Sequence, residues 1–286
     1  MLSAALGYMK IYYLYVVLEW LDQLNYIKFT NNSCTHEQLL IRIKWMNPRA
    51  TTNQAYVPTT VEHIANVITH GIWIIPSIWG SLELLKRSKT WTQFVSASVY
   101  GTSLILVFAV STFFHTVHYC NHNRPLKDTL HRCDRAMIYI FIAASYFPWL
   151  NIDLLTNDEL LSTFRYTIWI MALMGIVYQQ IFHERYKLLE TIFYLIMGLG
   201  PSIAIVNAHN YYNITELKAG GAVYILGIIF FKSDGRIPFA HAIWHLFVAA
   251  AAAFHYYAIL NYVFSNDDSI FKDSPVHNLH ETHLEL

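Results

Sequence analysis

Seven apolar segments run along the chain from about residue 65, separated by short connections that hold most of the charged residues. A membrane-spanning helix needs about 20 consecutive, mostly apolar residues. By that measure the predicted spans are 65–85, 94–118, 136–154, 164–183, 188–208, 218–232 and 239–263. The pattern therefore predicts an all-α polytopic membrane protein with seven transmembrane helices.

The sixth predicted span is the shortest, because its uncharged core is only AGGAVYILGIIFF. A segment of that length crosses a bilayer where the bilayer thins locally or where neighbouring helices enclose it. If it does not cross, the chain has six spans and its C-terminus lies on the other side of the membrane.

The composition agrees with a membrane protein. Of the 286 residues, 55% are hydrophobic and only 13% are charged, whereas charged residues make up about 25% of a typical soluble domain. The mean hydropathy is +0.32. Lysine and arginine together equal aspartate and glutamate, so we expect no basic surface and no nucleic acid partner.

The seven spans form one predicted membrane domain, residues 61–264, between two terminal segments. Residues 1–60 are predicted to be a cytoplasmic N-terminal segment. Within it, IYYLYVVLEWL is apolar but too short to span, which favours a helix lying at the membrane interface. Residues 265–286 are predicted to be a polar C-terminal tail.

The lysines and arginines of the short connections predict the orientation of the chain. If the N-terminus is cytoplasmic, the inner connections hold more of these residues than the outer ones, although the cluster Lys86, Arg87 and Lys89 opposes the trend. We therefore predict a cytoplasmic N-terminus and a C-terminus outside or in the lumen. The sequon Asn213-Ile-Thr215 then lies on the outer side, where glycosylation is possible.

Polar residues at the ends of three predicted spans indicate a common site. Ser111 and His115 share a helix face at the end of the second span, and Asp134 opens the third. His241 and His245, four residues apart, open the seventh span. Four crossings separate the start of the third span from the start of the seventh, so these span ends lie on one side of the membrane. In the predicted orientation that side is cytoplasmic.

Three histidines and a carboxylate at one depth favour a zinc site. Catalytic zinc commonly takes three protein ligands and keeps a fourth position for water. We predict His115, His241 and His245 as the ligands, Asp134 as the base for the water, and Ser111 as the group that orients the water or a substrate carbonyl. The alternative is that each histidine is a hydrogen-bonded packing residue, which the matching depth of all four groups argues against.

The start of the first span presents a polar face formed by Glu62, Asn66, Thr69 and His70. Glu62, Asn66 and His70 are candidates to orient a zinc ligand from the second shell. The alternative, a polar network that fixes the first span to its neighbouring connections, stays open. The connection between the second and third spans also contains several potential zinc ligands, although their spacing matches no standard zinc-finger pattern. They are His118, Cys120, His122, His131 and Cys133. A solvated loop is the favoured interpretation there, and a separate zinc site is the weaker alternative.

Four strings resemble the progestin and adipoQ receptor family, which is related to the haemolysin III proteins. They are EHIANVITHG at 62–71, STFFH at 111–115, CDRAMIYIFIAASYFPWL at 133–150 and FKSDGRIPFAHAIWHLFVAAAAAFHYYA at 231–258. The resemblance covers about residues 45–263 and is strongest to the monocyte-to-macrophage differentiation factor branch. It implies seven helices, a cytoplasmic N-terminus, zinc held by the three histidines, and an aspartate beside the water.

The resemblance implies more than one function. Some members of the family look like lipid amidases that act on ceramide, which favours a zinc-dependent hydrolase with a membrane lipid as its substrate or ligand. Others are described as receptors or signalling adaptors, in which a structural zinc would brace the helices and cytoplasmic signalling proteins would bind. A pore is a third possibility, but no span has a charged stripe. We expect an integral membrane protein of the Golgi, the lysosome or late endosome, or the plasma membrane.

Overall fold

The computed structural model describes residues 44–50, 55–120, 124–151, 159–208 and 215–265. Within these ranges the chain forms helices and no strand, which confirms the predicted all-helical class. The segment before residue 44, with its predicted interfacial helix, lies outside the described residues, as do Asn213 of the sequon and the tail beyond residue 265.

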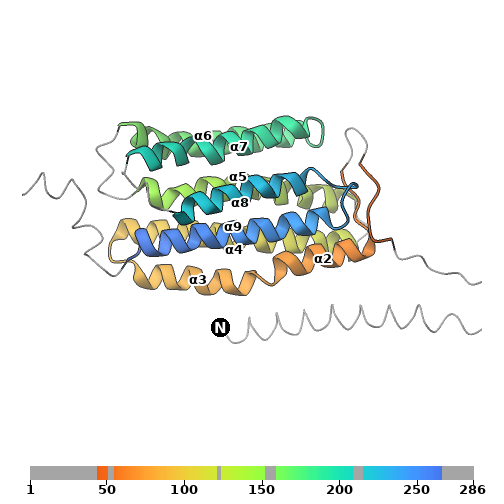
Figure 1. Ribbon diagram of the computed structural model, residues 1–286, viewed down its shortest axis with the longest axis horizontal. Helices are drawn as coiled ribbons and strands as arrows, with labels where there is room; N and C mark the ends of the chain where they lie inside the picture. Colours follow the sequence, from red (N-terminus) through yellow and green to blue (C-terminus); the bar gives the residue numbers. More distant parts are fainter. Residues whose placement is uncertain (1–43, 51–54, 121–123, 152–158, 209–214, 266–286) are drawn as a thin grey trace, which may run out of the picture. The chain divides into compact units, whose positions relative to one another are not determined.

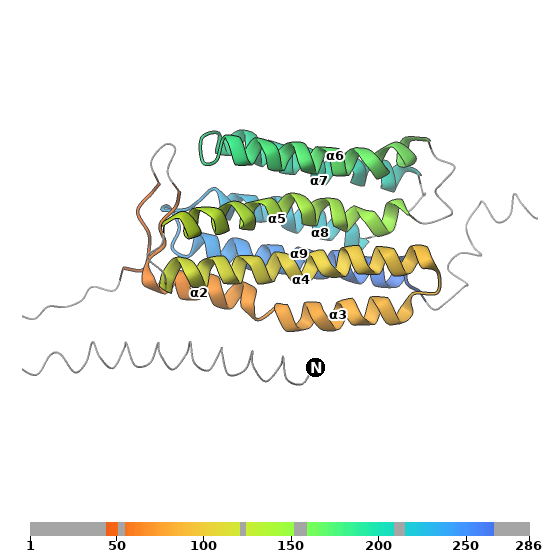
Figure 2. The ribbon, with the colours of Figure 1, turned by 180° about the vertical axis from the view of Figure 1, so that it is seen from behind.

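Eight helices occupy the described ranges; most follow the predicted spans, but α5 begins twelve residues before the predicted third span. They are α2 (Thr60–Gly71), α3 (Ile74–Arg87), α4 (Trp91–Cys120), α5 (Arg124–Leu150), α6 (Glu159–Ile181), α7 (Lys187–Ala208), α8 (Thr215–Phe231) and α9 (Ala240–Tyr262). The helices lie side by side along a common direction (Figure 1). The view from behind shows the same arrangement (Figure 2).

The first predicted span is not one helix, which corrects the sequence-based expectation. It is divided into α2, of 12 residues, and α3, of 14 residues, which follow each other end to end (Figure 1). Pro76 explains the break, because it has no N–H to bond the carbonyl of Ile72 and its ring crowds that carbonyl. Gly71 is the last residue of α2 and weakens the helix further at this point.

Helix α4 lies at the centre of the packing and contacts α2, α3 and α5, while α9 contacts α8 and α2. Small residues bring α3 and α4 together. The Ser81 hydroxyl donates a hydrogen bond to the carbonyl of Gly101 at 3.0 Å, and a Cβ atom on Gly101 would come within 2.8 Å of the Ser81 side chain. Close helix contacts through small residues are typical of membrane proteins, where lipid gives helices no hydrophobic reason to associate.

Large apolar side chains cover the outer surface of the helices. Trp79 and Trp91 are each 76% exposed, and Leu188 is 70% exposed. A soluble protein rarely exposes apolar groups of this size in large patches, because water contact is unfavourable. Within the part of the chain that the structure describes, two helices, at Trp91–Tyr119 and Ala240–Tyr262, are long and apolar enough to cross a membrane. The predicted total of seven spans stays a prediction.

The polar residues singled out in the sequence meet at one end of this bundle. Helix α4 ends there, α5 and α9 begin there, and α2 lies alongside (Figures 1 and 2).

Candidate metal centre

His115 from α4 and His241 and His245 from α9 face one another. The ring of His115 lies 5.2 Å from each of the other two rings, and the rings of His241 and His245 are 4.7 Å apart, measured between centroids. One ring nitrogen from each histidine lies within 4.8 Å of those of the other two. The three residues could therefore hold one metal ion.

The hydrogen bonding of these histidines fits a metal. His115 is 1% exposed, yet neither of its ring nitrogens has a hydrogen-bond partner among the described residues, and Nδ1 of His241 also lacks one. Buried polar atoms without a partner are costly and rare in folded proteins. A cation bound between the rings would satisfy these lone pairs, so the donor set suits a metal ion.

Thr69 of α2 orients His245. The Thr69 hydroxyl donates its hydrogen to the carbonyl of Ala65 at 2.7 Å, and its oxygen lies 3.1 Å from Nδ1 of His245. Because the hydroxyl hydrogen is already used, Nδ1 of His245 is the donor in this pair. The other nitrogen, Nε2, is then the unprotonated one and can bind a metal.

The three candidate residues on the same face of α2 have different roles. His70 stacks on the ring of His245 at 3.6 Å, and so contacts a candidate ligand. The Asn66 side-chain amide donates to the Tyr56 hydroxyl at 2.9 Å. Glu62 instead accepts hydrogen bonds from the backbone and hydroxyl of Thr59, which form a capping box at the start of α2.

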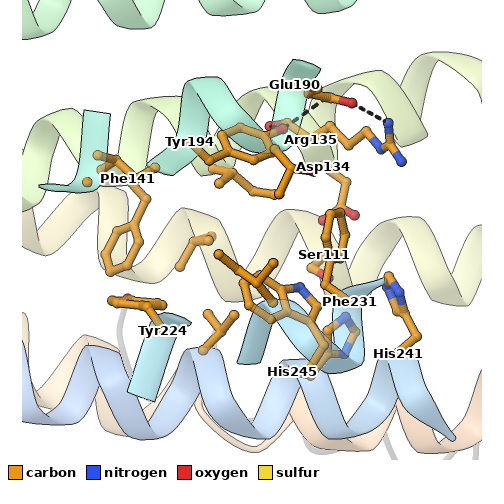
Figure 3. Close-up of a pocket in the computed structure, with 18 of the residues that line it drawn as sticks. Ser111, Asp134, Arg135, Phe141, Glu190, Tyr194, Tyr224, Phe231, His241 and His245 are labelled. Carbon is orange, nitrogen blue, oxygen red and sulfur yellow. Dashed lines mark hydrogen bonds and ion pairs between the residues drawn. The ribbon is translucent and has the colours of Figure 1, made fainter. Parts of the chain in front are cut away.

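A cavity of about 610 Å³ opens beside the three histidines. Asp134, which lies within the first half of α5 and not at its start as the sequence suggested, and the buried Ser111, one turn before His115, both line it. In the view of Figure 3, Ser111 lies between Asp134 and the two histidines of α9, His241 and His245. The structure thus brings together all five residues proposed for catalysis and metal binding, although Asp134 is not part of the compact ligand group.

An ion-pair network on the α5 and α7 side of the cavity was not predicted from the sequence. The Arg135 guanidinium pairs with Glu190 at 2.7 Å, and the Tyr194 hydroxyl donates to the same carboxylate at 3.0 Å (Figure 3). Arg135 directly follows Asp134, so the network anchors α5 where it presents that carboxylate. The arginine was visible in the sequence, but its partners lie in a distant segment.

A second group of potential metal ligands consists of His131, His183 and Glu184. It shares one residue, His131, with the loop site considered as an alternative above. Of the other residues of that alternative, His122 lies outside the described residues and Cys133 is exposed. Glu184 is already paired, with Arg135 at 2.8 Å and with Lys187 at 2.5 Å. Its backbone has φ of 64°, a left-handed conformation that costs a non-glycine residue about 1–2 kcal/mol.

Comparison with known proteins gives the family. Residues 59–256 match the sequence family described as "Haemolysin-III related". The chain is 48% identical to the human monocyte to macrophage differentiation factor over 222 residues, which cover 77% of this chain and 92% of that protein. It is 37% identical to hemolysin-3 of Bacillus cereus over 211 residues, covering 71% of this chain and 92% of that protein.

This chain is therefore a helical integral membrane protein with a group of three histidines, two of them buried, that could hold a metal ion. It belongs to the haemolysin III-related family, which confirms the resemblance seen in its motifs, including the likeness to the monocyte to macrophage differentiation factor.

Proposed function

We propose that this protein is a zinc-dependent hydrolase that cleaves an amide bond of a membrane lipid, such as that of ceramide. Zinc would be held by His115, His241 and His245. Asp134 would serve as the general base, and Ser111 would orient the water or the carbonyl of the lipid.

The observation that carries this proposal is a three-histidine cluster open to a cavity. Structural zinc sites normally have four protein ligands, whereas catalytic sites have three and an open position. Here three ligand atoms gather within 4.8 Å, and the cavity beside them is lined by Asp134 and Ser111. Bound zinc would polarise the carbonyl and lower the pKa of water to about 7.

The chain's own residues account for the proton transfers. Asp134 accepts a proton as the water oxygen bonds to the carbonyl carbon, and the Ser111 hydroxyl, which lines the cavity beside Asp134, holds a reacting oxygen. The C–N bond then breaks, and Asp134 returns the proton to the departing nitrogen. The products are a fatty acid and an amine, so atoms and charge balance.

The lining of the cavity supports a lipid as the ligand. Away from the metal end, apolar side chains from α5, α7, α8 and α9 face the space: Phe141, Ile142, Leu195, Leu199, Ile225, Ile228 and Val248. Such a surface suits an acyl chain, whose transfer out of water is favourable by about 0.8 kcal/mol for each CH₂ group.

The proposed orientation of the chain places the metal centre on the cytoplasmic side of the membrane. Seven spans, counting α2 and α3 together as the first, with a cytoplasmic N-terminus put the metal centre at the cytoplasmic face and the C-terminus outside or in the lumen. The membrane is the Golgi, the lysosome or late endosome, or the plasma membrane. Cytoplasmic signalling proteins are the proposed partners, and they would be the main partners if the protein is a receptor or adaptor instead.

The test compares the purified full-length chain with Asp134→Asn, both loaded with zinc in nanodiscs and given fluorescent ceramide and N-acylethanolamine. We expect the wild type to release fatty acid. The Asp134→Asn variant should keep its zinc and lose about 10²–10⁴-fold in kcat, because general-base catalysis is worth that much.

Two results would contradict the proposal. If the zinc-loaded wild type releases no fatty acid while untargeted lipidomics of cells with and without the protein shows no lipid change, a structural zinc in a receptor or adaptor is the better account. If Asp134→Asn hydrolyses as fast as the wild type, the assigned base is wrong.

A further inference from the structure

Tyr56, in the segment before α2, reaches the metal centre. Its ring stacks on the ring of His241, with 5.0 Å between centroids and 26° between planes, and it lines the cavity. The Asn66 side chain donates a hydrogen bond to its hydroxyl at 2.9 Å. Two contacts therefore fix the position of this ring beside the most accessible of the three histidines.

Asn66 and Thr69 act on different parts of the centre from the same helix. Thr69 holds Nδ1 of His245, whereas Asn66 holds the phenol that covers His241. The Asn66 side chain therefore has a role of its own on the polar face of α2, apart from the Asn66 backbone, which hydrogen-bonds His245. The side-chain amide positions Tyr56.

The hydroxyl hydrogen of Tyr56 is free to bond a ligand. The oxygen accepts from Asn66, and within the described residues no acceptor for the hydrogen is recorded. The ordinary pKa of a tyrosine phenol is about 10, so the hydroxyl carries its hydrogen at neutral pH. A neutral phenol beside a metal site, with an unused hydrogen and a cavity in front of it, is a hydrogen-bond donor for an oxygen atom of the ligand.

We propose that Tyr56 is a further catalytic residue, whose hydroxyl donates a hydrogen bond to the carbonyl oxygen of the lipid as negative charge develops on it. The role rests on the proposed hydrolase function. A donor fixed in advance stabilises that charge without reorganisation when the reaction occurs. Asn66 is then a positioning residue that acts through Tyr56.

Tyr256 provides a matched control within the same chain. Its hydroxyl donates to the carbonyl of Gly80 at 3.1 Å, between α9 and α3, and it does not line the cavity. Replacing either tyrosine with phenylalanine removes one hydroxyl and keeps the ring. Only the change at Tyr56 removes a donor that faces the ligand.

The experiment uses zinc-loaded full-length protein in nanodiscs and two measurements. The first is the kcat for hydrolysis of fluorescent ceramide. The second is the calorimetric affinity for palmitoyl hydroxamate, which binds metals through its oxygens and does not require turnover. We expect Tyr56→Phe to keep its zinc, to lose about 10²–10³-fold in kcat, and to bind the hydroxamate about tenfold more weakly.

The controls separate the donor from packing and from the wider proposal. Tyr256→Phe should match the wild type in both measurements. Asn66→Ala should weaken hydroxamate binding by less than Tyr56→Phe does. The double variant of Asn66→Ala and Tyr56→Phe should bind the hydroxamate about as weakly as Tyr56→Phe alone. Unchanged hydroxamate affinity in Tyr56→Phe would overturn the inference, and so would loss of zinc, which would make Tyr56 a support for His241. If the wild type cleaves nothing, the hydroxamate measurement still decides the donor role.

Discussion

Two groups of potential metal ligands lie at the same end of the bundle, and they differ in the charge around them. In the group of His115, His241 and His245, both ring nitrogens of His115 lack a hydrogen-bond partner among the described residues, and the charged neighbour is a carboxylate, Asp234, 3.8 Å from Nδ1 of His241. In the group of His131, His183 and Glu184, the carboxylate is paired with Arg135 and Lys187. A metal cation is attracted to donors whose lone pairs are free and is repelled by neighbouring cations. Ligand atoms at suitable distances are therefore not enough to define a metal site.

The second group has a different structural purpose. Glu184 is 6% exposed, and its left-handed backbone follows the end of α6, where glycine is usual. The carboxylate holds Arg135, which also pairs with Glu190 on α7. These ion pairs fasten the first half of α5 to the turn between α6 and α7 and to the first turn of α7. The first group is thus prepared for a ligand, and the second stabilises the helix that supplies Asp134.

The largest expected effect is the loss of bound zinc when a ligand of the group of His115, His241 and His245 is removed. His245→Ala should reduce bound zinc from about one equivalent per chain to close to none, because a catalytic site with three protein ligands cannot spare one. Elemental analysis of the purified variant measures this directly. Retention of the full zinc content would show that the metal is held elsewhere.

A change at Glu184 should destabilise the fold. Glu184→Gln should lower the stability by about 3 kcal/mol, because removal of one partner leaves buried charge uncompensated. Glu184→Gly should lose about 1 kcal/mol less, because glycine adopts a positive φ without strain. Thermal unfolding in detergent compares the two variants. A Glu184→Gly protein more stable than the wild type would mean that the ion pairs contribute nothing.

Loss of the Thr69 hydroxyl should weaken the metal site without removing it. Thr69→Val keeps the shape of the side chain but frees Nδ1 of His245, and such changes typically cost 10–100-fold in metal affinity. Competition with a fluorescent chelator gives the affinity. Thr112→Val is the matched control, because the Thr112 hydroxyl bonds only the carbonyl of Phe108 among the described contacts. Equal losses in both variants would contradict the assigned role.

The smallest expected effect is on metal binding by the second group. His183→Ala should bind as much zinc as the wild type, since Glu184 in this group is already neutralised by its cationic neighbours. The same elemental analysis tests this variant. If its zinc content falls, the second group also binds metal and the contrast between the two groups fails.

Much of the metal centre could be predicted from the sequence. A pair of histidines four residues apart must share a helix face, and the parity of the spans brings His115 and Asp134 to the same end. Both steps depend only on helix geometry and on the number of crossings. Pro76 and Gly71 also signal the break between α2 and α3 in the sequence. The hydrophobic pattern alone missed it, because apolar residues continue through a break in backbone hydrogen bonding.

The remaining contacts depend on packing between distant segments. Thr69 and His245 are 176 residues apart, and nothing near either one in the sequence indicates their contact. The spacing of the polar residues predicts that they share one face of α2. It does not predict that Glu62 caps the helix or that Asn66 holds Tyr56. The partners of Arg135 are likewise set by how α7 lies against α5.

The most direct test of the account is X-ray absorption at the zinc edge of the purified full-length protein. The account predicts about three imidazole nitrogens at roughly 2.0–2.1 Å together with oxygen from water, and no sulfur. Protein that carries no zinc after loading, or a spectrum with sulfur at about 2.3 Å, would contradict a three-histidine centre.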